Sequence, residues 1–147
     1  MKFIAATASS LALLASLASV QAYDKNDFKG KFVGTDTTGI HGDHGVEMEG
    51  KMKLVIVKVT STEDRDGGTL EGKWHYAGEH DDGETEDVVG IWFEDGNFHM
   101  IETTQTGTID GCLHDQGKDM YASLVLTEPG SGGEDGLVAA GHRLDKK

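Results

Sequence analysis

Apolar and polar side chains alternate along much of this chain, which is the spacing of a β-strand with one face in a core. The clearest run is Leu70-Glu71-Gly72-Lys73-Trp74-His75-Tyr76, in which every second residue is apolar or glycine. Near the start of the chain Phe28, Gly30, Phe32 and Gly34 share one face, and two lysines share the other. Both segments predict strands whose apolar face turns inward.

Further segments show the same alternation or a short apolar run, and none shows the stripe or the capped start of an amphipathic helix. They are Val46–Thr60, which contains two possible runs, Val88–Glu94, Asn97–Thr104, Gly107–His114, Met120–Thr127 and Leu137–Leu144. The pair Asp95-Gly96 is typical of a two-residue hairpin turn. The chain therefore predicts eight or nine short strands.

A glycine followed two residues later by a large apolar side chain recurs along the chain. The five glycines are Gly30, Gly50, Gly72, Gly90 and Gly111, at spacings of 20, 22, 18 and 21 residues. A strand, its return and their turns occupy about 20 residues, and a glycine inside a strand often marks a bend. The pattern predicts an all-β fold, an antiparallel up-and-down barrel of about eight strands, with a two-sheet β-sandwich as the alternative.

The first 22 residues differ from the rest of the chain. Lys2 is followed by an apolar stretch that is too short to span a bilayer, and then by Val20-Gln21-Ala22, with small side chains where a signal peptidase reads. We therefore expect a secretory signal peptide over 1–22 and one β-barrel domain over 23–147. The protein is expected to be secreted, either outside the cell or into a periplasm.

The charge balance is strongly acidic, with 13 basic and 26 acidic residues and a net charge of −13. No cluster of Lys and Arg suits a phosphate backbone, so nucleic acid is not an expected partner, and no second apolar stretch suggests a membrane. The single cysteine, Cys112, has no partner within the chain. It is expected to be buried, reactive, or paired with a second copy in a homodimer.

Two short points of the chain resemble the calycins, the superfamily of lipocalins and avidins. Such proteins open their first strand with Gly-x-Trp and carry an Arg near the end of the last strand. Here Gly30-Lys31-Phe32 stands at the first point, with Phe in place of Trp, and Arg143 stands at the second. The resemblance implies a barrel with an open end that can hold a small apolar ligand.

Three aromatic side chains are the candidates for such a ligand site. Trp74 and Tyr76 lie on one face of a strand, and Trp92 holds the same place as Trp74 in its own glycine repeat. Aromatic rings with a polar atom line many small-molecule pockets, although the same rings can fill a barrel core. The segment Gly39–Val46 is the candidate for a flap at the barrel mouth.

A second candidate site is a zinc or copper site. If Asn97–Thr104 and Gly107–His114 form a hairpin with a two-residue loop, His99 lies opposite Cys112 or His114, on the face that also carries Asp110. Imidazole and thiolate are good ligands for both metals. The opposite face is more apolar, so an exposed row of polar residues is the alternative. His41, Asp43, His44 and Glu47 form a second, looser metal-binding candidate.

The sequence thus predicts a secreted protein that binds a small molecule without turnover. An isomerase or cyclase using the same cavity is the enzymatic alternative, but it needs an inward acid or base, and His75 and Glu71 fall on the outward face. We therefore assign no catalytic residue, and no Gly-x-Ser-x-Gly motif points to one. An extracellular metal-binding or structural protein is the third hypothesis.

Overall fold

The computed structural model describes residues 21–41, 46–63, 66–78, 84–117, 119–129 and 137–147. These residues form one short helix and eight strands that close into an antiparallel barrel in chain order, with β8 paired to β1. The elements are α1 (Lys25–Phe28), β1 (Gly30–His41), β2 (Val46–Ser61), β3 (Gly67–Gly78), β4 (Glu84–Phe93), β5 (Asn97–Glu102), β6 (Thr108–Asp115), β7 (Met120–Glu128) and β8 (Leu137–Lys146). The predicted up-and-down barrel is confirmed, and the β-sandwich is excluded.

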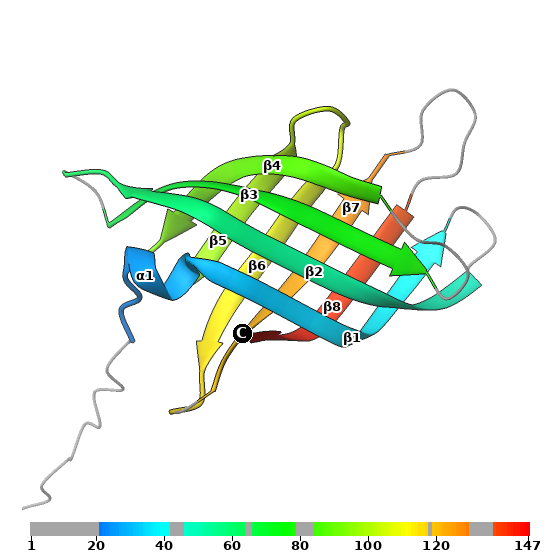
Figure 1. Cartoon of the computed structure of the whole chain (residues 1–147), viewed down its shortest axis with the longest axis horizontal. Coiled ribbons are helices and arrows are strands. Elements are labelled where there is room, and N and C mark those ends of the chain that lie inside the picture. Colours follow the sequence, from blue (N-terminus) through cyan, green and yellow to red (C-terminus); the bar gives the residue numbers. More distant parts are fainter. Residues whose placement is uncertain (1–20, 42–45, 64–65, 79–83, 118, 130–136) are drawn as a thin grey trace, which may run out of the picture.

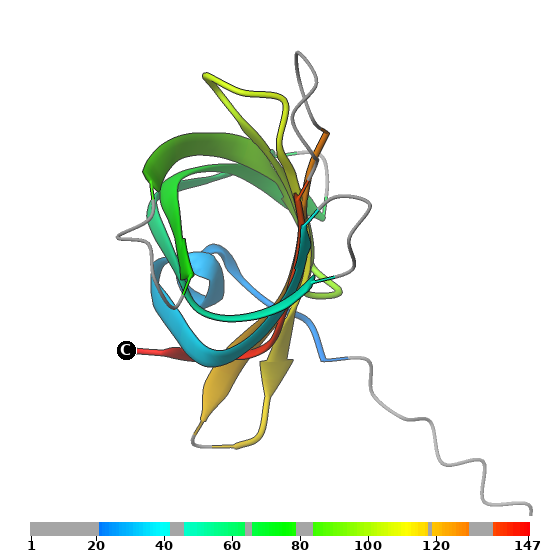
Figure 2. The same ribbon diagram turned by 90° about the vertical axis from the view of Figure 1, so that its right-hand side faces the viewer.

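The two ends of the barrel differ in the elements that they carry. The helix end carries α1 and the connections that follow β2, β4 and β6; the far end carries the connections that follow β1, β3, β5 and β7. Figure 2 shows α1 within the ring of strands. None of the described residues belong to a helix that is long and apolar enough to cross a membrane.

The alternating positions predicted to face inward form one hydrophobic core. Leu70, Trp74 and Met100 are each at most 2% exposed, and the polar residues between them lie outside. The core also contains Phe28, Phe32, Met52, Leu54, Ile56, Val88, Trp92, Phe98, Ile109, Leu113, Ala122, Leu124, Leu126 and Leu144. Burial of these side chains is the main favourable contribution to folding.

The glycine repeat leaves room for large side chains inside the barrel. A Cβ on Gly111 would lie 2.2 Å from the ring of Phe98, and one on Gly50 would lie 2.6 Å from the ring of Tyr76. These two glycines therefore mark places where an aromatic ring from a neighbouring strand crosses close to the backbone, whereas at Gly72 and Gly90 the neighbouring strand's own backbone is in the way.

Three local predictions are wrong. The segment Val46–Thr60 forms a single strand, β2, with a bulge between Ile56 and Lys58. The hairpin loop at Asp95-Gly96 has three residues instead of two, because the Gly96 amide bonds to the carbonyl of Phe93 and Gly96 has a φ of +92°. A capped helix does exist in the described chain, since Asp24 begins α1.

The helix α1 closes its end of the barrel. The Asp24 carboxylate accepts a bond from the Asn26 amide and the Asp27 carboxylate accepts one from the Asp24 amide, which is a reciprocal cap. Phe28, predicted on the first strand, is instead the last residue of α1 and is fully buried. Its ring lies 4.8 Å from that of Trp92.

The last strand holds α1 in place through Lys146. Its ammonium donates to the carbonyls of Asn26, at 2.9 Å, and Asp27, at 2.6 Å, and lies 5.8 Å from the centre of the Phe32 ring. Burial lowers the pKa of Lys146, and the nearby Asp27 opposes that shift. Arg143, the residue of the calycin resemblance, lies instead on the outer surface, over Tyr121. Lys146, and not Arg143, is therefore the cation that lies over Phe32, the aromatic ring of the first strand.

Candidate functional site

Trp74 and Tyr76 lie together on the inner face of β3 toward the far end. Their rings are stacked, with centres 6.2 Å apart and planes 12° from parallel. Trp74 is 2% exposed, and Tyr76 is half-buried and packs against the core. The prediction that both rings point inward is confirmed.

The hydroxyl of Tyr76 is an unusual atom in this interior. It is buried and has no hydrogen-bond partner among the described residues. Burial also raises the pKa of Tyr76, so the group stays a neutral hydroxyl that can donate or accept. A buried polar atom left unbonded costs about 1–3 kcal/mol. The far end therefore contains a hydrogen-bonding group that the described residues do not use.

Glu102 adds a carboxylate to the same interior. It ends β5, is 4% exposed, and is the buried charged residue of the described chain. Its Oε2 accepts a bond of 3.1 Å from the amide of Gly107. Glu102 continues the inward alternation of Phe98 and Met100, so a signal for this residue was present in the sequence although it was not among the predicted site residues.

A second carboxylate, Glu86, lies on the inward side of β4. It pairs with Trp74 across β3 and β4, and Val88, two residues on, pairs with Glu102 across β4 and β5. Glu86 accepts hydrogen bonds from Thr104 and from Gln105, both in the β5–β6 connection. Trp74, Glu86 and Glu102 therefore form one inner patch across three neighbouring strands.

Trp92 does not join this patch. It lies at the helix end, against Phe28, and its indole N–H donates to the Thr60 carbonyl at 2.9 Å. Its hydrogen-bonding atom is thus already used by the fold. The structure brings Trp74 and Tyr76 together and separates Trp92 from both.

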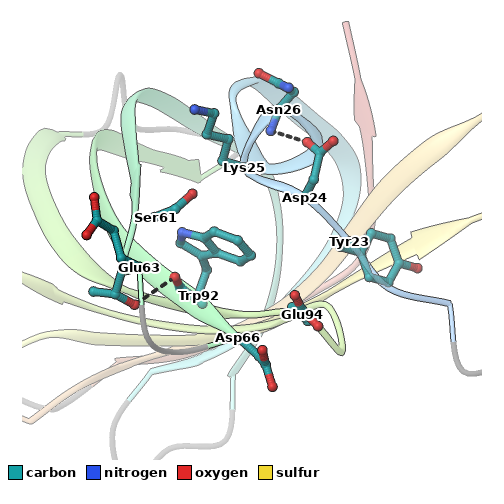
Figure 3. Close-up of a pocket in the computed structure, with 11 residues that line it drawn as sticks. Tyr23, Asp24, Lys25, Asn26, Ser61, Glu63, Asp66, Trp92 and Glu94 are labelled. Carbon is teal, nitrogen blue, oxygen red and sulfur yellow. Dashed lines mark hydrogen bonds between the residues drawn. The ribbon is translucent and has the colours of Figure 1, made fainter.

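A surface pocket of about 560 Å³ opens beside Trp92 at the helix end. Figure 3 shows the indole between the segment that contains Asp24 and Lys25 and the one that contains Ser61 and Glu63. The Asp24 carboxylate caps α1 and the indole N–H is bonded to Thr60. Two of the polar groups that line this pocket therefore already have partners within the fold, and the pocket lies where α1 packs against the barrel.

The predicted register of the hairpin that carries His99 is wrong. His99 lies opposite Asp110, and its Nδ1 is 2.7 Å from the Asp110 carboxylate, whereas Cys112 lies opposite Asn97. The cause is the connection over 103–107, which is longer than the two residues assumed. His114 pairs with Tyr121 on β7, and its Nε2 lies 2.9 Å from the Ser123 hydroxyl.

These residues lie on the outer face, as the alternative interpretation expected. Cys112 is half-buried, and burial raises the pKa of its thiol, with Asp95 adding to the shift, which disfavours the thiolate that a metal needs. Within the described part of the chain no group of three or more His, Cys, Asp or Glu is placed to hold a metal ion. The looser candidate, from His41 to Glu47, and the Gly39–Val46 flap fall largely outside the described residues and side chains.

Glu71 and His75, the acid and base considered for an enzyme, lie on the outer face as predicted. Glu71 pairs with Lys58 at 2.5 Å, and the His75 ring lies 3.2 Å from the Thr85 hydroxyl, both on the outer surface. Among the described residues, Glu102 and Glu86 are acids on the inner face, and Glu102 is the one that is fully buried.

Comparisons with protein-family models, with curated proteins and with solved structures found no match. What the strand pairing and the closed sheet establish is an eight-stranded antiparallel barrel, which is compatible with a calycin-like fold.

Proposed function

We propose that this protein is a calycin-like binding protein that holds a small, partly apolar molecule in the far end of its barrel, without chemical turnover. The apolar body of the ligand packs against the stacked rings of Trp74 and Tyr76. A polar group of the ligand bonds to the Tyr76 hydroxyl. Apolar burial supplies most of the affinity, and the polar contact sets the orientation.

The observation that carries this proposal is the unbonded hydroxyl of Tyr76. Buried polar groups in proteins nearly always have partners, and an exception calls for an explanation such as a bound molecule. Trp92 at the opposite end provides the contrast, because its N–H is bonded within the fold. The two ends therefore differ in whether the interior leaves a polar atom for a ligand.

Binding is preferred over catalysis because of the groups on the inner face. The four histidines whose side chains are described, His75, His99, His114 and His142, are exposed or bonded on the outer face. The inner carboxylate of Glu102 accepts a backbone hydrogen bond. The interior thus supplies groups for orientation and lacks, among these residues, an imidazole for proton transfer.

Export and association belong to the same proposal. The leader expected over 1–22 would deliver the protein outside the cytosol, where a carrier meets its ligand. A homodimer is supported by apolar side chains on the outer face of β4 and β5: Ile91, Phe93 and Ile101 are each 45–46% exposed. Exposed apolar patches of this kind are typical of protein contacts.

The proposal is tested by titrating the purified protein with the fluorescent probe N-phenylnaphthylamine and displacing it with phenylbutanol. We expect micromolar displacement, and the variant Tyr76→Phe should weaken phenylbutanol binding about two- to tenfold because one hydrogen bond is lost. Tyr121→Phe, which removes a hydroxyl from the outer face, is the matched control and should change nothing. Absence of probe binding, or equal effects of the two variants, would overturn the proposal.

A further inference from the structure

We infer that the bond between Ala22 and Tyr23 is a processing site, and that the α-ammonium which its hydrolysis leaves on Tyr23 becomes a structural group of the helix end. The inference rests on the leader that belongs to the proposed function, and it gives a role to the new end of the chain. It comes from the burial of Tyr23, from the bond that its backbone nitrogen makes, and from the acids around that nitrogen.

The first step is the boundary between exposed and buried chain, which falls at this bond. Gln21 and Ala22 are exposed, whereas Tyr23 is 8% exposed. The Tyr23 ring lies 6.4 Å from that of Phe28 and packs against the turn at Gly96, where an added Cβ would lie 2.8 Å from the ring. The packed core therefore includes the residue that directly follows the expected cleavage site.

The second step is the backbone nitrogen of Tyr23. Its N–H donates to the carbonyl of Glu94 at 2.8 Å. Hydrolysis by a signal peptidase adds one water across the amide, so the Ala22 carbonyl becomes a carboxylate and the Tyr23 nitrogen becomes an amine. An α-amino group has an ordinary pKa of about 7.7–8.0, so it is protonated at neutral pH. The ammonium can keep the bond to Glu94, and a charged donor makes a stronger bond than an amide.

The third step is the set of carboxylates on both sides of this nitrogen. Tyr23 lines the pocket beside Trp92 together with Asp66 and Glu94. A second pocket is lined by Ala22, by the same two acids, and by Phe93 and Asp95. In the view of Figure 3 Glu94 lies between Tyr23 and Asp66. A positive charge made at this bond would therefore have acids of two connections beside it.

The remaining charges near Tyr23 are also mostly acidic. The first pocket includes Asp24 and Glu63, and Lys25 is the cation among the described residues that line either pocket. Asp27 and Asp115 lie near the phenol of Tyr23. Carboxylates around an ammonium favour its charged form. Because Glu63, Asp66 and Glu94 are exposed, each contributes modestly, and the bond to the Glu94 carbonyl is the main contribution.

The burial of Tyr23 also determines when the bond can be cut. A peptidase must reach the chain on both sides of the bond, but in the folded barrel the Tyr23 side chain is buried and its N–H is bonded. Hydrolysis of the folded protein therefore has to pass through a state in which the helix end is open. During export, removal of the leader precedes the closure of this end of the barrel.

The first test isolates the ammonium. The exported product is compared with an exported variant that carries one extra Gln between Ala22 and Tyr23, in which the Tyr23 nitrogen is again an amide. Mass spectrometry gives the N-terminal residue of each. At pH 6 the unfolding constant from urea titration should be about fivefold smaller for the exported protein than for the variant, because a charged donor replaces a neutral one. The leader-bearing chain of 147 residues, made without export, should resemble the variant.

The pH dependence of this difference identifies the group. Nearby acids raise the folded pKa of the amine above its unfolded value, so its contribution is complete below the unfolded pKa and is lost as the pH rises through the folded pKa. The fivefold difference should therefore shrink toward none by pH 10. The phenol of Tyr23 is present in both proteins and does not contribute to the difference.

The second test concerns the order of events. The folded leader-bearing chain is incubated with purified signal peptidase, and release of residues 1–22 is followed by mass spectrometry. Phe28→Ala, which removes the ring that Tyr23 packs against, should be cut at least tenfold faster than the wild type. Val138→Ala, at an exposed position on β8, is the matched control and should be cut at the wild-type rate.

The outcomes separate this inference from the proposed function. Equal unfolding constants at pH 6 for the exported protein and the Gln insertion, or a difference that persists to pH 10, would overturn the role of the ammonium. Equal cleavage of the wild type and Phe28→Ala would overturn the order of events. Both results leave binding of N-phenylnaphthylamine untouched. An exported product that begins elsewhere than at Tyr23 would overturn the inference together with the leader of the proposed function.

Discussion

The two ends of this barrel are built from the same strands and treat their polar groups in opposite ways. At the helix end, the indole of Trp92 bonds to Thr60 and the ammonium of Lys146 bonds to two carbonyls of α1. Toward the far end, the hydroxyl of Tyr76 is buried and unbonded among the described residues. The comparison teaches that the helix end uses its inner polar groups to hold the fold together, whereas the far end keeps a buried polar group that the described residues do not bond.

The largest expected effect comes from removing the ring that closes the helix end. Phe28→Ala should lower the free energy of unfolding by about 3–5 kcal/mol, because a fully buried aromatic ring is lost and a cavity remains. Urea unfolding followed by fluorescence measures it. Phe93→Ala, at a ring that is 45% exposed, is the control and should cost well under half as much. Equal losses in the two variants would contradict the role given to the helix end.

A substitution at the far end should act in the opposite direction. Tyr76→Phe should raise the free energy of unfolding by about 1 kcal/mol, because it removes a buried hydroxyl that lacks a partner. The urea midpoint of the ligand-free protein is the measurement, with Tyr121→Phe as the control on the outer face. A destabilised Tyr76→Phe would show that the hydroxyl is used by the fold, and the difference between the two ends would disappear.

The same residue gives a pH dependence with a defined sign. Burial raises the pKa of Tyr76 above its ordinary value of 10.0 in the folded state, so the folded protein keeps this proton while the unfolded chain loses it. Its contribution to stability is complete below the unfolded pKa and is lost as the pH rises through the folded pKa. The free energy of unfolding of Tyr76→Phe should therefore exceed that of the wild type by a larger amount above pH 10 than below it. A constant gap would contradict this.

The smallest effect is expected where the last strand holds α1. Lys146→Met keeps the apolar stem and removes the ammonium, which should destabilise the fold by about 1 kcal/mol. The effect is modest because burial already disfavours the charged form of Lys146. Lys147→Met, at an exposed position, is the control. If Lys146→Met were neutral, the closure of the helix end would depend on the ring of Phe28 alone.

The fold was predictable because alternation survives along most strands. Trp74 and Tyr76 were placed inward by spacing of two, and the structure agrees. The helix α1 was missed because four residues are too few to show a helical period. Its signal was local: Asp24 followed three residues later by Asp27, whose carboxylate bonds back to the first amide.

The site was harder to predict than the fold. Glu102 continues the inward series of Phe98 and Met100, but a carboxylate in that series suggests a strand end in solvent. The register of His99 depended on the length of the connection over 103–107, which no turn motif fixes, and a small error in loop length exchanges Cys112 for Asp110 as its neighbour. Pairing partners between strands depend on loop geometry that alternation does not encode.

The pairing of β8 with β1 closes the barrel by joining its first and last strands. Seven of the eight ladders join consecutive strands, so this seam is the ladder that joins the first strand to the last. The amide of Lys147 donates to the carbonyl of Lys31, and Lys146 reaches α1, so the two ends of the domain meet. A circular permutant that links these ends and opens at another turn would retain each of these strand pairings. The strands follow one another around the closed barrel, so the pairings alone do not require the chain to begin at β1.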